Sequence, residues 1–161
     1  MVLAENKNGW KLLEYLDIKE TDIDKYYNIT GAFAILKIKN EYVLGYNRWR
    51  RQWEFPAGHI EKDENPRYAA ERELLEETHQ KNSNLIFKGL AKVSNAKDET
   101  RYQAIYFCEQ DELSEFIKNS EDEMDKIILW DMEEDIGYID EVDLKIVQIS
   151  CMDKWMATSN L

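Results

Sequence analysis

Three glutamates, Glu73, Glu76 and Glu77, lie close together in the run RELLEE. In an α-helix these three side chains fall within about 100° of one another on one face. Leu74 and Leu75 point away from them, which predicts a helix with one carboxylate face and one core face. Like charges stacked in this way cost roughly a few tenths of a kcal/mol per pair, and nothing in helix stability compensates for that cost. A divalent cation compensates, because hard oxygen ligands suit Mg²⁺ or Mn²⁺.

The residues before the glutamates supply the start of that helix. Asn65 is suited to cap free backbone amides, and Pro66 at the first helical position loses no hydrogen bond that it would have made. Residues 69–77 continue with good helix formers. The sequence therefore predicts a loop followed by a helix that carries the carboxylates.

The segment 58–80 resembles the Nudix box, in which a glycine, five residues, Glu, seven residues and Arg-Glu-apolar-x-Glu-Glu-x-Gly-apolar follow one another. Constrained positions of this box are filled as the pattern requires by Gly58, Glu64, Arg72, Glu73, Leu74, Glu76 and Glu77. So many constrained positions at fixed spacing are specific, and the chain is identified as a member of the Nudix hydrolase family, MutT-like.

The last two positions depart from the pattern. His79 stands where the family has glycine, and Gln80 stands where it has an apolar residue. The glycine normally ends the helix in a left-handed conformation, which costs a residue with a Cβ about 1 kcal/mol. We therefore expect the helix to run one or two residues longer, with Asn82 in the left-handed position. We expect His79 to be exposed, with a hydrogen bond to Glu76 as the alternative.

The resemblance implies a ligand set for Mg²⁺ or Mn²⁺ that consists of Glu73, Glu76, Glu77 and the backbone carbonyl near Gly58. It also implies that Arg72 and Glu64 orient the glutamates, and a planar, always charged guanidinium can grip a carboxylate with two bonds. Glu73 is our first choice for the general base, because a helix and Arg72 fix its position. The alternative is a solvated, salt-bridged helix.

In enzymes that the box resembles, the group that deprotonates or holds the attacking water is a box glutamate or a carboxylate on the loop before the late buried strand. Here that loop, 120–125, contains Glu121 and Glu123, and either could swing toward the metals. The alternative is a solvated acidic turn.

An arginine-rich segment precedes the box. Arg48, Arg50 and Arg51 could clamp phosphates, and Trp53 could offer a flat face to a base. In a chain otherwise strongly acidic, this cluster predicts substrate binding. The alternative is an exposed loop whose arginines pair with glutamates, with Trp53 in the core.

The net charge limits the classes of molecule that the protein is expected to bind. Thirty-three acidic and 21 basic residues give −12, which disfavours duplex nucleic acid. A nucleotide remains an acceptable partner if metal neutralises its phosphates. Without a long apolar run at either terminus, we expect no signal peptide, no membrane span and a cytoplasmic monomer or homodimer. Cys108 and Cys151 are expected to be buried, reduced thiols.

The remaining pattern predicts an α+β fold with a single domain over 1–161. Alternating and apolar runs predict strands at 31–39, 42–46, 53–55, 85–93, 101–108 and 127–130. Apolar spacing of three and four residues predicts a packed helix over about 140–155, and 1–28 could add a strand and a charged turn. This order resembles the family's α/β/α sandwich, a mixed sheet with the box as loop and helix.

The function implied is hydrolysis of a pyrophosphate bond in a nucleoside diphosphate linked to a group X. Ala57 stands where nucleotide-pool sanitising members usually have glycine, and in this the chain resembles ADP-ribose pyrophosphatases. Those enzymes often carry a proline some fifteen residues after the box, but residues 95–97 contain none. We rank a nucleoside triphosphate or oxidised dNTP first, and ADP-ribose or a dinucleotide second. The rivals are a non-catalytic nucleotide-sensing module and an isoprenoid diphosphate isomerase, which would need a reactive cysteine such as Cys108.

Overall fold

The computed structural model describes residues 1–153, and in these residues a single mixed sheet dominates the fold. Its strands, in chain order, are β1 (Ala4–Glu5), β2 (Lys11–Leu16), β3 (Ile29–Ile38), β4 (Glu41–Asn47), β5 (Gln52–Glu54), β6 (Ala57–His59), β7 (Ile86–Ser94), β8 (Thr100–Gln110) and β9 (Met124–Trp130). The helices are η1 (Glu20–Lys25, a 3₁₀-helix), α1 (Pro66–Thr78), α2 (Glu141–Val147) and η2 (Gln148–Asp153, a π-helix).

The strand order is β1-β2-β7-β8-β3-β4-β5, with β6 paired to β3 and β9 paired to β4. The long strand β3 is the centre of this arrangement. It pairs in parallel with β8, and it pairs antiparallel with β4 and β6. The predicted hairpin at 31–46 is therefore confirmed as β3 and β4. Pairing of β6 with the first half of β3 brings Gly58 opposite Ala32.

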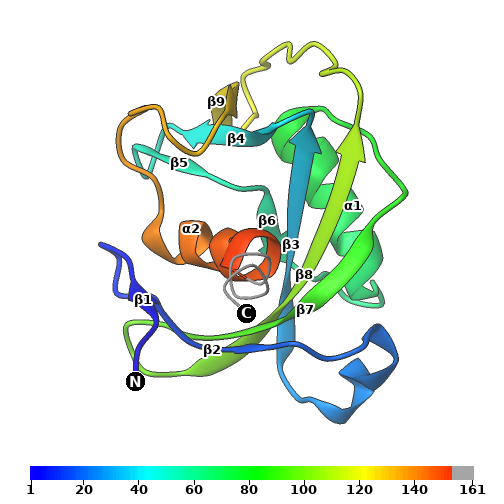
Figure 1. Cartoon of the computed structure of the whole chain (residues 1–161), viewed down its shortest axis with the longest axis vertical. Coiled ribbons are helices and arrows are strands. Elements are labelled where there is room, and N and C mark those ends of the chain that lie inside the picture. The colour runs from blue at the N-terminus through cyan, green and yellow to red at the C-terminus, as the bar shows by residue number, and fades with distance from the viewer. Residues whose placement is uncertain (154–161) are drawn as a thin grey trace.

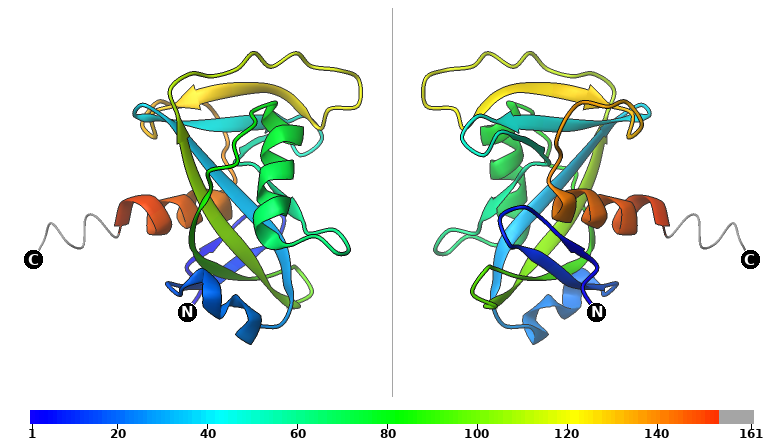
Figure 2. Two further views of the ribbon diagram at one scale, coloured as in Figure 1. Left: turned by 90° about the vertical axis from the view of Figure 1, so that its right-hand side faces the viewer. Right: turned by 90° about the vertical axis from the view of Figure 1, so that its left-hand side faces the viewer.

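Two apolar layers cover the two faces of β3, because alternate residues of a strand face opposite sides. Ala32, Ala34 and Leu36 pack with Leu74 of α1, whereas Phe33 and Ile35 belong to the layer that includes α2. Figures 1 and 2 show α1 and α2 on opposite sides of β3 and β8. The predicted α/β/α sandwich with a mixed sheet is confirmed.

Most predicted elements are present with shifted ends. The expected N-terminal strand forms as β2, and the charged turn after it forms η1. The packed C-terminal helix begins after Asp140, whose side chain accepts hydrogen bonds from the amides of Val142 and Asp143. It stays α-helical only to Val147 and continues as η2, and positions 154 and 155 of the prediction lie outside the described residues.

The end of α1 differs from the prediction. The helix stops at Thr78, and His79 itself takes the left-handed conformation, with φ 62° and ψ 21°. Its amide donates to the carbonyl of Leu75 and closes the helix, so Asn82 is not the left-handed residue. The predicted helix faces also need correction. Leu74 is buried, but Leu75 is 45% exposed.

The remaining predictions concern the thiols and the membrane. Cys108 is buried as expected, whereas Cys151 is only partly buried, and neither forms a disulfide. Among residues 1–153, no helix combines the length and the apolar character needed to cross a bilayer.

Candidate active site

Arg72 lies among the box carboxylates. Its Nε and Nη2 donate to the two carboxylate oxygens of Glu64 at 2.7 and 2.9 Å, and its Nη1 donates to Glu73 Oε1 at 2.8 Å. A further bond from Nη2 reaches the carbonyl of His59 at 2.8 Å, and Nη1 lies 3.1 Å from Glu76 Oε2. The hydrogen bonds from Arg72 lower the pKa of Glu64. This one side chain ties the loop after β6 to the carboxylate face of α1.

Two of the three glutamates are buried, although the sequence pattern placed all three on one face. Glu73 is 9% exposed and Glu77 is 7% exposed, whereas the side chain of Glu76 is 58% exposed. One oxygen of Glu77 accepts a hydrogen bond from the amide of Ala57 at 3.1 Å. The face is therefore directed partly toward β6 rather than wholly toward solvent.

Burial raises the pKa of Glu77 well above its usual range, and the charges of Glu73 and Glu123 raise it further. Burial also raises the pKa of Glu73, which the ion pair with Arg72 partly offsets. Neighbouring negative charges contribute to both shifts, so a cation bound nearby would favour the ionised forms of these carboxylates.

The residues present fit Mg²⁺ or Mn²⁺ by the chemistry of their donors. Such cations take carboxylate and backbone carbonyl oxygens and keep several waters, and β6 runs so close to Glu73 that a side chain at Gly58 would collide with the carboxylate. In residues 1–153, no three His, Cys, Asp or Glu side chains converge to enclose an ion. Arg72 instead holds Glu73 and Glu76 in ion pairs.

Glu123, rather than Glu121, lies at this site. Glu123 Oε1 accepts a hydrogen bond from Asn47 Nδ2 at 2.7 Å and lies 3.8 Å from Arg50 Nη1. Its charge contributes to the raised pKa of both Glu73 and Glu77. Glu121 is exposed in a turn, where its amide donates to Asn119 Oδ1.

The arginines of the 48–51 loop have different environments. Arg50 Nη1 donates to both oxygens of Glu54, at 3.0 and 3.3 Å, so the predicted pairing with glutamates holds for this residue. Arg48 lies over the Trp49 ring at 4.9 Å. Arg51 is exposed and has φ 54°, at the tight turn between β4 and β5.

Trp53 cannot serve as the base platform suggested above. It is 7% exposed and belongs to the core that includes α2, and its indole N–H donates to the carbonyl of Ile136 at 2.7 Å. Strand alternation on β5 turns its ring inward, which corrects the prediction in favour of its core alternative.

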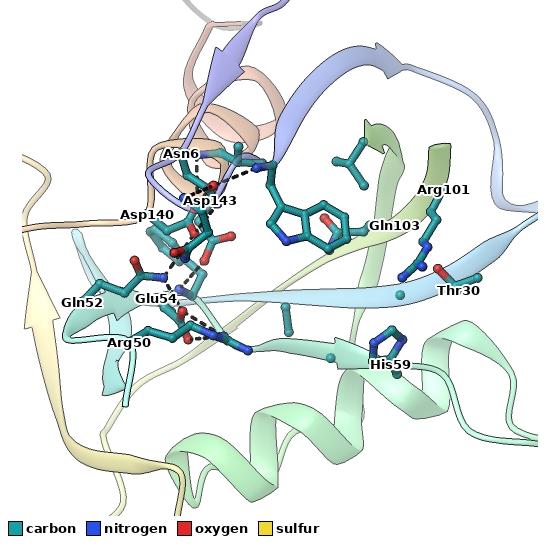
Figure 3. A pocket seen from close by; sticks show the side chains of 18 residues that line it. Asn6, Thr30, Arg50, Gln52, Glu54, His59, Arg101, Gln103, Asp140 and Asp143 are labelled. Atoms are coloured by element: carbon teal, nitrogen blue, oxygen red, sulfur yellow. Dashed lines mark hydrogen bonds and ion pairs between the residues drawn. The ribbon is translucent and has the colours of Figure 1, made fainter. Parts of the chain in front are cut away.

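A pocket of about 370 Å³ adjoins the box at residues 57–59. Figure 3 shows an acidic end formed by Glu54 of β5 and by Asp140 and Asp143 at the start of α2, and an opposite end with Arg101 and His59. Trp10 also lines the pocket, and the Arg101 guanidinium lies 5.9 Å from the centre of its ring. The pocket thus offers hydrogen-bond acceptors, a cation and an aromatic face.

The acidic end is held in place by the surrounding chain. Asp143 Oδ2 accepts from the amide of Phe55 at 3.0 Å, and Asp140 Oδ2 accepts from Asn6 Nδ2 at 2.9 Å. Burial raises the pKa of Asp143 well above its usual range, and the charges of Asp140 and Glu54 raise it further. Burial likewise raises the pKa of Asp140. The Gln52 amide links two of these groups, because its Nε2 donates to Glu54 Oε2 and to Asp140 Oδ2.

Sequence reasoning missed most of this pocket. Its walls come from residues that are distant in the chain, chiefly Trp10, Arg101, Asp140 and Asp143. The one available signal was the position of Trp10 directly before the alternating run that forms β2.

A protein-family model described as the NUDIX domain matches residues 29–148. The chain belongs to the NUDIX domain family. No curated protein sequence matches the chain significantly.

Solved structures of Nudix proteins have the same fold. The pyrophosphohydrolase BsRppH of Bacillus subtilis is 19% identical with TM-score 0.72, over 98% of this chain and 97% of that chain. The NUDIX domain of Shewanella oneidensis NrtR, crystallised with ADP ribose, is 13% identical with TM-score 0.63, over 88% and 99%. A C. elegans Ap4A hydrolase is 16% identical with TM-score 0.55, over 81% and 98%.

The family model confirms the predicted family and, with it, the class of enzyme, a hydrolase of phosphoric anhydrides; the solved structures confirm the Nudix-type fold. At these identities the structures themselves establish the fold alone.

Proposed function

We propose that this Nudix protein is a cytoplasmic enzyme that hydrolyses a pyrophosphate bond in a nucleoside triphosphate or an oxidised dNTP, using Mg²⁺ or Mn²⁺. The observation that carries the proposal is the pair of buried carboxylates, Glu73 and Glu77, next to Gly58 at the border of the pocket. A phosphate chain bound at the box would place its nucleoside in the pocket, which Gly58 also lines.

The bound cations would neutralise phosphate charge and lower the pKa of a coordinated water. Glu73, Glu76 and Glu77 would hold them, together with the backbone carbonyl near Gly58. Arg72 fixes the carboxylate of Glu73, so Glu73 is suited to orient the attacking water and accept its proton. Glu64 in turn orients Arg72 by two hydrogen bonds.

A second acceptor for that proton is available in Glu123. It lies within the electrostatic reach of Glu73 and Glu77. Asn47 Nδ2 donates to Oε1 of Glu123, so Oε2 is the oxygen that could accept the proton. We favour Glu73 as the base and give Glu123 the supporting role.

The pocket supports a mononucleotide as substrate. Its volume of about 370 Å³ is at the lower end of the range for small-molecule sites and suits one nucleoside. Trp10 offers a face for stacking, and the carboxylates of Glu54, Asp140 and Asp143 line the other end of the pocket. Arg101, and Arg50 beside its partner Glu54, would place positive charge at the pocket in a chain whose net charge is −12.

The isomerase alternative requires a reactive cysteine. Burial, with a smaller contribution from the Glu109 charge, raises the pKa of the Cys108 thiol to about 12. Such a thiol carries almost no thiolate at neutral pH, which argues against nucleophilic or acid–base use.

An assay of phosphate and pyrophosphate release tests the proposal. The panel holds the common and oxidised (d)NTPs, ADP-ribose, a dinucleoside polyphosphate and an isoprenoid diphosphate, each with Mg²⁺ or Mn²⁺. We expect the highest kcat/KM for a triphosphate. Preference for ADP-ribose or the dinucleotide would overturn the substrate class, and binding without turnover of any compound would favour the nucleotide-sensing alternative.

A further inference from the structure

The two residues that depart from the box pattern contact the same segment of the chain. His79 and Gln80 both reach the loop 111–123, which joins β8 to β9 and passes over the end of α1. In Figure 2 this loop runs along one edge of the molecule. We propose that His79 and Gln80 fasten this loop to α1 and thereby position Glu123 at the box carboxylates. The proposal rests on the proposed function for the role of Glu123.

His79 makes two contacts with the loop. Its ring lies 4.4 Å from the Phe116 ring, centre to centre, and its Nε2 lies 3.4 Å from Asp122 Oδ2. Both contacts start from the C-cap of α1, where the His79 backbone is left-handed. The glycine of the family pattern would satisfy this backbone conformation but would supply neither contact.

Gln80 is fully buried and uses both ends of its amide. Its Nε2 donates to the Ser114 carbonyl at 2.7 Å, and its Oε1 accepts from the Ser114 amide at 2.8 Å. Gln110 Nε2 also donates to Gln80 Oε1 at 3.0 Å. An apolar residue at position 80 would remove both hydrogen bonds that hold the Ser114 backbone to the end of α1.

Glu123 lies between two fixed neighbours. Asp122, which His79 contacts, accepts a hydrogen bond from the Asn119 amide at 2.8 Å and closes a turn. Met124 is 1% exposed and begins β9. With the chain held on both sides, the Glu123 carboxylate is directed to Asn47.

One physical requirement explains why both His79 and Gln80 depart from the box pattern. A loop of this length would otherwise sample many conformations, and fixing a carboxylate on it costs conformational entropy in every turnover. Contacts from His79 and Gln80 at the end of a rigid helix would order the loop before substrate binds, so this entropy is not lost again in each turnover. His79 and Gln80 are therefore positioning residues, whereas Glu123 is the group that faces the box.

Hydrogen exchange of the full chain tests the fastening directly, without any substrate. His79→Gly keeps the left-handed cap and removes the ring, so the fold is expected to survive. We expect amides in 112–123 to exchange about tenfold faster in His79→Gly, and in Gln80→Leu as a second variant. The control Glu115→Gln, an exposed carboxylate on the same loop, should exchange as the wild type does. Unchanged exchange in both variants overturns the proposal.

Kinetics then tests the positioning of Glu123. If His79 acts through Glu123, His79→Gly lowers kcat with little change in KM, and the double variant His79→Gly/Glu123→Gln is no slower than Glu123→Gln alone. If the losses in kcat of the two single variants multiply in the double variant, His79 does not act through Glu123. Failure of every nucleotide to turn over would instead overturn the proposed function, and the exchange result would still decide whether the loop is fastened.

Discussion

Gly58 and Glu73 are packed so closely that a Cβ on Gly58 would lie 2.2 Å from Glu73 Oε1. The contacted atom is the far end of the Glu73 side chain, but Arg72 donates a hydrogen bond to the same oxygen at 2.8 Å, so the carboxylate cannot move away without losing that ion pair. The glycine at the start of the box is therefore required by the position of the carboxylate as well as by the path of β6.

Replacement of that glycine should damage the site more than the fold. We expect Gly58→Ala to displace the Glu73 carboxylate and to lower kcat by at least ~10-fold, because a small misplacement of a catalytic group is costly. Steady-state kinetics measures this, and circular dichroism checks the fold. Wild-type turnover in Gly58→Ala would mean that the position of Glu73 is not critical.

Glu77→Gln should separate stability from activity. The side chain is buried and its pKa is raised, so an uncharged isostere removes an unfavourable charge. We expect the metal-free Tm at neutral pH to stay the same or rise, while kcat falls by at least ~100-fold. Glu76→Gln, on the exposed side chain, should lower kcat with little change in Tm. Full activity in both variants would place the metal elsewhere.

Stabilisation by Mg²⁺ should depend on pH. The pKa values of Glu73 and Glu77 are raised in the folded protein. The stability that their protonated forms contribute to the metal-free fold is therefore fully present below their pKa values in the unfolded chain. It is lost as the pH rises through their pKa values in the folded protein. A cation binds the ionised forms and reverses this effect. We expect the increase in Tm with millimolar Mg²⁺ to be larger at about pH 8 than at about pH 5. Thermal scans at both pH values measure it, and an equal increase at both would contradict the ligand set.

The three loop arginines should contribute unequally to substrate capture. Replacing Arg48, Arg50 and Arg51 together by Gln should raise KM several-fold at low salt and change kcat less. Arg50, which lines the pocket, should account for most of this effect when changed alone. Lys19→Gln, which removes one exposed cation on the segment before η1, is the charge-matched control for Arg50→Gln alone. An unchanged KM in the triple variant would leave phosphate capture to the metals.

Trp10 should bind the base of the substrate. We expect Trp10→Ala to raise KM by about tenfold, since stacking of a base on an aromatic ring is worth about 1–3 kcal/mol. Trp10→Phe should keep most of the affinity, because it retains a flat face. Titration with a non-hydrolysable nucleotide measures the affinity directly. Equal weakening in Trp10→Phe and Trp10→Ala would point to packing of the N-terminal segment instead.

Local relationships were readable from the residues alone. The cap at Asn65, the start at Pro66 and the three glutamates of α1 depend on contacts within about four residues, which spacing determines directly. Strands were found because alternation and β-branched runs report on a half-buried strand. Their ends shifted by a few residues, because pairing with neighbouring strands decides where a strand stops.

The sequence could not tell which of two candidates at the same spacing faces the site. Glu121 and Glu123 are the same residue type, and on an extended chain their side chains point to the same side. The turn closed by Asn119 and Asp122 leaves Glu121 exposed. Asn47 Nδ2 donates a hydrogen bond to Glu123 and holds it at the site. Trp53 was similarly ambiguous, because a tryptophan suits both a core and a binding surface.

The sequence by itself determined the family, the metal-ligand candidates and the helix that presents them, because these depend on local spacing and side-chain chemistry. Only the tertiary structure decided that Glu73 and Glu77 are buried, that His79 ends the helix and contacts Asp122, and that a pocket forms beside Gly58. Burial and long-range pairing arise when distant strands and α2 pack on β3. No pattern within a single segment contains that information.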